Sequence, residues 1–135
     1  MTMPKLKQSM SNLKNALDRL EDAVQRETTD KLLIDGTIQR FEFTIELFWK
    51  TLKRFLEEDG VEATTPRSTL KEAYKANWIH NEEIWLKMLK DRNSTSHVYD
   101  EKLAERIYKN IKQYYPIMKE TYLFLQQKIN DEEGN

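Results

Sequence analysis

The sequence has no cysteine and is poor in turn-forming residues, with three glycines and three prolines among 135 residues. Without cysteine the chain can form no disulfide, no thiol nucleophile and no cysteine-ligated metal site, a composition typical of a reducing compartment. Three glycines are too few for the glycine-rich loops that cradle phosphates, and two histidines leave little for a zinc site. We therefore expect neither a metal nor another cofactor.

A large net charge and long apolar runs are also lacking. The 22 basic and 23 acidic residues give a net charge of −1, which argues against strong, general binding to nucleic acid but leaves room for a small local basic site. No stretch of about 18 apolar residues occurs, and the opening MTMPKLKQSM contains no apolar run of signal-peptide length. We expect a soluble, cytoplasmic protein that does not enter a membrane.

What the sequence does contain is helical periodicity over most of its length. Apolar residues recur at steps of three and four, the spacing that places them on one side of a helix. The pattern predicts helices over residues 4–27, 31–58, 66–76 and 82–92, and a last helix after residue 100 that reaches about residue 129. The expected fold is an all-α, up-and-down bundle of four main helices and one short helix. We expect one domain over residues 1–135, frayed at 1–3 and 130–135.

Capping residues mark the helix boundaries. Short polar side chains that can accept hydrogen bonds from the first backbone N–H groups of a helix stand at Asp30, Thr65, Asn81 and Asp100. Gly60 suits a helix end. Pro116 lies inside the last apolar stripe, which continues on both sides of it. We therefore expect this proline to kink the last helix rather than end it.

The second helix is apolar on two opposite sides. Seven residues between Ile34 and Phe55 point within about 60° of one direction, whereas Leu32, Phe43 and Leu47 lie on nearly the opposite side. A helix of this kind is either central in its own bundle or shared with another chain. We favour the second explanation and expect Leu32, Phe43 and Leu47 to form a homodimer interface. Burial under other helices of the same chain is the alternative.

The connection before the last helix, KDRNSTSHVYDEK at residues 90–102, is rich in polar and proton-transfer groups. One interpretation is structural: Arg92 is a favourable cation in the last turn of a helix, Asn93 and the serines satisfy its free carbonyls, and His97 is incidental. The other is catalytic: His97 exchanges protons near neutral pH, and Arg92 holds a phosphate through two hydrogen bonds. Such groups without a metal suit RNA cleavage, in which the 2′-hydroxyl attacks the neighbouring phosphorus.

The string DRNSTSHVYDE resembles a known motif. Arg92, four intervening residues and His97 have the spacing of the HEPN superfamily (higher eukaryotes and prokaryotes nucleotide-binding). The continuation to Tyr99 resembles, more specifically, its nucleotidyltransferase substrate-binding branch. The arginine–histidine spacing alone is a weak pattern. The place of the motif between two helices and the aromatic FEFTIELFWKTLK of the second helix extend the resemblance over essentially the whole chain.

The resemblance implies a function. Members of this branch form homodimers that bring two motifs together, and they are usually encoded beside a minimal nucleotidyltransferase. The pair is thought to act as toxin and antitoxin: the HEPN chain is a metal-independent endoribonuclease, and its partner silences it with adenylate from ATP. Carried to this sequence, Arg92, Asn93 and His97 are the catalytic residues, RNA is the substrate, and Tyr99 is the modified residue. The alternative is a non-catalytic subunit that presents a substrate to a separate nucleotidyltransferase.

Overall fold

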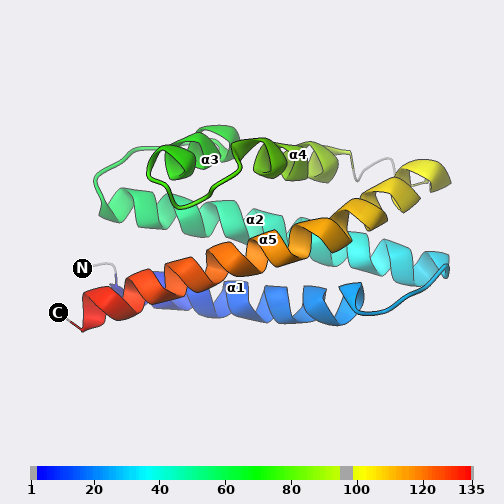
Figure 1. Ribbon diagram of the computed structural model, residues 1–135, viewed down its shortest axis with the longest axis horizontal. Helices are drawn as coiled ribbons and strands as arrows, with labels where there is room; N and C mark the ends of the chain where they lie inside the picture. The colour runs from blue at the N-terminus through cyan, green and yellow to red at the C-terminus, as the bar shows by residue number, and fades with distance from the viewer. Residues whose placement is uncertain (1–2, 95–98, 135) are drawn as a thin grey trace.

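The computed structural model describes residues 3–94 and 99–134. These residues form five helices and no strand, which confirms the expected all-α bundle (Figure 1). The helices are α1 (Met3–Val24), α2 (Lys31–Glu58), α3 (Pro66–Lys75), α4 (Glu82–Asn93) and α5 (Glu101–Glu133). No described helix combines the length and apolarity needed to cross a lipid bilayer.

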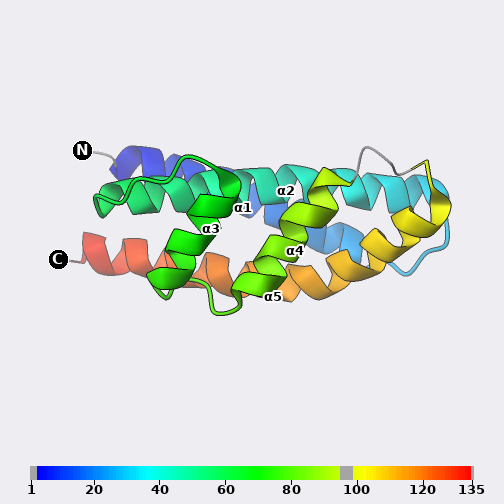
Figure 2. The same ribbon diagram turned by 90° about the horizontal axis from the view of Figure 1, so that it is seen from above.

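Three long helices run along the molecule, and two short ones cover one side of it. α1, α2 and α5 lie along the long axis, and α3 and α4 lie on top of α2 and α5 (Figures 1 and 2). α1 begins and α5 ends at the same end of the bundle. The connection from α1 to α2 and the start of α5 lie at the opposite end, toward which the last turn of α4 points (Figure 2).

The four expected capping residues are confirmed as helix N-caps: Asp30, Thr65, Asn81 and Asp100. α2 ends at Glu58, and Gly60 follows with φ of 76°, a left-handed conformation that glycine adopts without strain. α1 stops at Val24, three residues earlier than expected. Beyond it the hydroxyl of Thr28 accepts a hydrogen bond from the backbone N–H of Asp30, a local turn that competes with helix.

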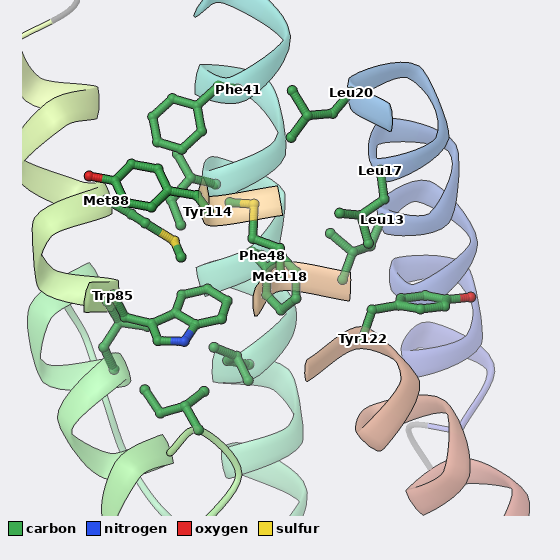
Figure 3. Packing of buried hydrophobic residues seen from close by; sticks show 14 of the residues in the cluster. Leu13, Leu17, Leu20, Phe41, Phe48, Trp85, Met88, Tyr114, Met118 and Tyr122 are labelled. Atoms are coloured by element: carbon green, nitrogen blue, oxygen red, sulfur yellow. The ribbon is translucent and has the colours of Figure 1, made fainter. Parts of the chain in front are cut away.

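A single core joins α1, α2, α4 and α5. Figure 3 shows leucines of α1 on one side of Phe41 and Phe48 of α2, and Trp85 of α4 and Tyr114 of α5 on the other side. The rings of Phe48 and Trp85 meet edge to face at 4.9 Å between centroids, and those of Phe41 and Tyr114 stack at 5.7 Å. Such pairs add about 0.5–1.5 kcal/mol each beyond the area that they bury. The core thereby fixes α4 against α2 and α5.

Threonines allow α1 and α2 to approach closely. Thr37, Thr44 and Thr51 are buried on α2 at intervals of seven residues, and each hydroxyl donates to the carbonyl four residues earlier. These hydroxyls satisfy their own hydrogen-bonding needs within the helix. Thr44 lies against α1, with its hydroxyl 3.5 Å from the carbonyl of Ala16.

α5 is the longest helix, and its 33 residues extend over about 50 Å at 1.5 Å per residue. It continues through Pro116, as expected from the apolar stripe on both sides of that residue. It reaches Glu133, into the segment expected to be frayed. Side-chain pairs four residues apart, Gln126–Asn130 and Gln127–Asp131, support these last turns.

Candidate functional site

The candidate site is built on the last turn of α4. Asn81 caps this helix, its side-chain oxygen accepting a hydrogen bond from the backbone N–H of Ile84 at 3.2 Å. The buried face of α4 carries Trp85, Met88 and then Asp91, three residues apart in each case. The buried face of α4 therefore ends in a carboxylate, that of Asp91, which directly precedes Arg92 in the sequence.

Asp91 fastens this turn to α5. Its Oδ2 accepts a hydrogen bond from the hydroxyl of Tyr114 at 2.6 Å and another from the amide of Asn110 at 3.0 Å. Burial, and then the hydrogen bond to Asp91, raise the pKa of the Tyr114 phenol far above its usual range. The phenol therefore remains a donor at all physiological pH values. A buried carboxylate with two donors is a fixed point for the end of α4.

Arg92 bridges α4 and α2. Its Nη2 contacts Oε2 of Glu46 at 2.5 Å, and Nη1 donates to Oδ1 of Asn93 at 3.3 Å. The other carboxylate oxygen of Glu46 lies 3.4 Å from the ammonium of Lys50. The side chain of Arg92 keeps 36% of its surface exposed, and that of Glu46 keeps 29%. The guanidinium is thus oriented by α2 yet still reachable from solvent.

α4 ends at Asn93, and Ser94 is its C-cap. The hydroxyl and the backbone N–H of Ser94 both donate to the carbonyl of Lys90, which satisfies an otherwise free helix end. Asn93 is exposed beside Arg92. His97, the expected acid and base, lies outside the described residues, so its placement relative to Arg92 stays a prediction.

Tyr99 stands on the other side of residues 95–98, just before the N-cap of α5. It is 83% exposed, the largest exposed fraction among the large apolar and aromatic residues of the described segments 3–94 and 99–134. Asp100 follows and accepts hydrogen bonds from the first N–H groups of α5. An ion pair between Lys31 and Glu101 joins the starts of α2 and α5, and this contact raises the pKa of Lys31. Tyr99 is therefore a surface residue at a well-anchored helix start.

A groove of about 900 Å³ leads along α4 to the candidate site. The residues around Thr65 at the start of α3 form one wall, and α4 forms the other. Four cationic side chains and one acidic side chain line it: Arg67, Lys87, Lys90, Arg92 and Glu83. Half-buried Ile84, Leu86 and Leu89 make part of its surface apolar. The groove is a local basic region on a chain that is nearly neutral.

The outer face of α2 has the apolar residues expected there. Leu32 is 78% exposed and Phe43 is 54% exposed, so burial by other helices of this chain does not explain them. Leu47 is half-buried and packs against the core. Phe43, Leu47 and Gly36 line a second groove of about 790 Å³ between α1 and α2.

Three features of the site were not predicted from the sequence. Glu46 is one of several acidic residues on α2, and only folding pairs it with an arginine 46 residues away. The groove likewise depends on how α3 packs beside α4. Asp91, in contrast, left a signal in the sequence, because it follows Met88 by one helical turn and so continues the core stripe.

Comparison with known families identifies the chain. The profile of the family described as "Nucleotidyltransferase substrate binding protein like" matches residues 8–127, most of the sequence. The chain belongs to this family. The expected membership in the nucleotidyltransferase substrate-binding branch of the HEPN superfamily is thereby confirmed.

Relatives of this nucleotidyltransferase substrate-binding protein carry two kinds of description. "Probable ribonuclease HepT" of Haemophilus influenzae (strain Rd) is 37% identical over 84 residues, which make up 58% of this chain and 58% of the relative. The chain therefore aligns with somewhat more than half of that relative. A solved structure from Haemophilus influenzae is described as revealing the fold of a substrate-binding domain of a nucleotidyltransferase.

Two solved structures share the fold. A protein of Thermus thermophilus has a TM-score of 0.77 at 32% identity, covering 82% of this chain and 95% of that one. The substrate-binding domain from Haemophilus influenzae has a TM-score of 0.68 at 26% identity, covering 92% of this chain and 98% of that one. The fold of this chain is thus shared with both solved structures.

Proposed function

We propose that the protein is a HEPN-type, metal-independent endoribonuclease, the toxin of a two-component pair. The observation that carries the proposal is Arg92, whose guanidinium is oriented by Glu46 at the surface, at the end of a helix fastened by Asp91. An oriented and accessible guanidinium is suited to a phosphodiester, because it can donate two parallel hydrogen bonds to phosphate oxygens. The relative described as a probable ribonuclease HepT supports this assignment.

The proposed reaction is an internal transesterification. The 2′-hydroxyl of the substrate attacks the adjacent phosphorus, the bond from phosphorus to the 5′-oxygen breaks, and a 2′,3′-cyclic phosphate and a 5′-hydroxyl result. His97 takes the proton of the attacking hydroxyl or supplies one to the leaving oxygen. Arg92 stabilises the charge that develops on the phosphorane, and Asn93 orients the substrate or the histidine. No metal ion or cofactor is needed for these steps.

Cleavage by this route needs one group that removes a proton and another that delivers one. Two copies of the motif would supply both, so we propose a homodimer in which two sets of Arg92 and His97 face one cleft. Leu32, Phe43 and Leu47 are the proposed contact, because the first two are exposed and apolar. Glu46 lies on the adjoining edge of the same helix, about 60° from Phe43. Such an interface should bury on the order of 1,000 Å² or more in total.

Silencing is proposed to occur at Tyr99. A minimal nucleotidyltransferase would hold ATP while the phenol oxygen of Tyr99 attacks the α-phosphorus. The bond between the α- and β-phosphates breaks, pyrophosphate leaves, and the phenol proton passes to a base or to water. The 83% exposure of Tyr99 makes its oxygen accessible to such a partner. Each adenylate adds a negative charge near the motif, and that charge competes with RNA phosphates for Arg92.

A second candidate function is favoured by the description of one relative. The Haemophilus influenzae structure is called a substrate-binding domain of a nucleotidyltransferase. In that case this chain would present a substrate to a separate nucleotidyltransferase and cleave nothing. Arg92 and the basic groove would then hold the substrate rather than support its cleavage.

The deciding experiment compares wild type and His97→Ala, each expressed without the partner. Growth arrest with wild type only, together with metal-independent cleavage of RNA by the purified wild type in the presence of a chelator, supports the ribonuclease. Equal growth and no cleavage support the binding subunit. Far-UV circular dichroism must show that both proteins are equally helical, so that misfolding does not imitate lost catalysis.

Adenylylation is tested by coexpression with the partner and intact mass analysis. The expected result is a gain of one or more adenylate units that is absent in Tyr99→Phe. Modification at another residue would contradict the assignment to Tyr99.

A further inference from the structure

We propose that the groove between the start of α3 and α4 binds the sugar–phosphate backbone of single-stranded RNA and guides it to Arg92. The inference rests on the proposed ribonuclease function and adds the route by which the substrate reaches the site. The groove has a volume of about 900 Å³, and Arg92, Asn93 and Ser94 line one end of it.

The positive charge of the groove favours a polyanion as its ligand. Arg67, Lys87 and Lys90 line the groove together with Arg92, against the single carboxylate of Glu83. Over the whole chain the 22 basic residues are outnumbered by 23 acidic ones, so this excess of cations is local. Lysine and arginine side chains attract phosphates irrespective of base sequence, and this attraction dominates the affinity of single-strand binding.

Two of the four groove cations form a line along α4 that ends at Ser94, and Arg92 points about 140° away from Lys87 around the helix axis. Lys87 and Lys90 lie one turn apart on the exposed side of the helix, and Ser94 continues the same line after one more turn. From Lys87 to Ser94 the helix rises about 10 Å. This length accommodates two or three consecutive phosphates of an extended strand, not one isolated anion.

These cations are available to a ligand. Within residues 3–94 and 99–134, no ion pair or hydrogen bond involves the side-chain nitrogens of Arg67, Lys87 or Lys90. By contrast, Lys50 and Arg92 near the same region contact Glu46. A phosphate can bind the three groove cations without first displacing a carboxylate.

The groove also has a surface that suits the rest of a nucleotide. Ile84, Leu86 and Leu89 are half-buried and line it between the charged residues. Apolar side chains pack against the faces of ribose and bases, which phosphate-binding residues alone cannot accommodate. A strand that lies in the groove would therefore contact cations through its backbone and leucine side chains through its nucleosides.

The test is binding of a fluorescein-labelled, single-stranded 12-nucleotide 2′-O-methyl RNA, followed by anisotropy at several salt concentrations. This probe has no free 2′-hydroxyl, so catalysis cannot consume it. The groove variant is Lys87→Gln/Lys90→Gln, and Arg67→Gln tests the opposite wall. The matched control is Lys5→Gln/Lys109→Gln, which removes the same charge from two exposed helical positions that line neither the groove nor the site.

The groove variant should weaken binding about 10- to 30-fold at 0.1 M NaCl and reduce the slope of log affinity against log salt by about 1.4, because two phosphate contacts are lost. Arg67→Gln should weaken binding about fivefold, and the control should remain within about twofold of wild type. Equal binding by the groove and control variants, or no binding by wild type, would overturn the proposal. If the groove variant binds RNA as wild type does but is adenylylated more slowly by the partner, the proposal is also overturned. The groove would then be a binding site for that partner.

Failure of this inference is distinguishable from failure of the proposed function. If wild type cleaves RNA and the groove variant cleaves it with unchanged KM, the ribonuclease stands and the groove assignment is wrong. If the groove variant loses RNA binding but wild type cleaves no RNA, the groove assignment stands and the catalytic proposal is wrong.

Discussion

The two faces of α2 are both apolar, but only one of them is buried. On the inner face Phe41, Phe48 and Phe55 are at most 1% exposed and fill the core. On the outer face Leu32 and Phe43 remain more than half exposed. Within the described residues, the other helices of this chain bury the apolar residues of the inner face, but they leave those of the outer face exposed. The difference separates residues that hold the fold together from residues available for assembly, although both sets are apolar.

Glu46 lies at the border between these faces and connects them to the site. It orients Arg92, and it lies one helical turn from Phe43 of the outer face. Substitutions at different angles around α2 should therefore affect different properties: folding on the inner face, association on the outer face and catalysis at the border.

The largest expected effect is on the inner face. Phe48→Ala removes a fully buried ring that contacts Trp85 and leaves a cavity at the junction of α2 and α4. We expect the free energy of unfolding to fall by about 3–5 kcal/mol, measured by urea denaturation followed by circular dichroism. A loss below about 1 kcal/mol would contradict the packing of α4 on α2.

The next effect is on association. Leu32→Gln/Phe43→Gln should weaken self-association by about 30-fold or more, corresponding to about 2 kcal/mol, while the free energy of unfolding of the monomer changes little. Sedimentation velocity over a range of concentrations measures it. The matched control is Leu123→Gln/Phe124→Gln, which replaces the same residue types at exposed positions of α5. A monomeric wild type at micromolar concentration, or dissociation of the control variant, would show that α2 is not the interface.

A smaller effect is expected at the border. Glu46→Gln removes the charge that orients Arg92, and we expect kcat/KM for RNA cleavage to fall about tenfold, or about 1.4 kcal/mol in transition-state stabilisation. Stability should change by less than about 1 kcal/mol, because the ion pair is partly exposed. Glu46→Asp should recover part of the activity. Equal losses of stability and activity in Glu46→Gln would instead indicate a purely structural role.

The smallest effect is expected at Gly36, in the second turn of α2. A Cβ added there would have no atom within 4 Å, so Gly36→Ala should raise the stability of an isolated chain by about 0.5–1 kcal/mol through helix propensity. Thermal unfolding measures this gain. If the gain in stability is accompanied by weaker self-association, the partner chain approaches the backbone of α2 at Gly36 closely.

Local patterns in the sequence predicted the helices and their starts, because caps and periodicity involve residues a few positions apart. Asp30, Thr65, Asn81 and Asp100 are all caps as predicted. The early end of α1 was not predicted, because the hydrogen bond of Thr28 that competes with the helix leaves no trace in the pattern of apolar residues. The exposure of Leu32 and Phe43 was also predictable from their angle around the helix.

The chemistry around Arg92 was only partly predictable. Arg92, Asn93 and Tyr99 could be chosen from the motif, but the motif does not reveal that Glu46 orients the arginine. That pairing depends on how α4 packs on α2. The periodicity of a sequence shows which residues share one face of a helix, but it does not show which helix that face will contact. The basic groove was beyond prediction for the same reason, since its two walls come from α3 and α4.

The length of α5 has a consequence for the order of folding during synthesis. Tyr114 and Asn110, which fasten Asp91, and Tyr115, whose hydroxyl donates to Glu21 of α1, all belong to α5. A ribosome makes this helix after the other four, so a nascent chain that lacks it exposes the inner surface of α1 and α2. The last turn of α4 then has no anchor for Asp91, and Arg92 acquires its final surroundings only when α5 has emerged and docked. On this view the surroundings of Arg92 are complete only after the longest helix has been made.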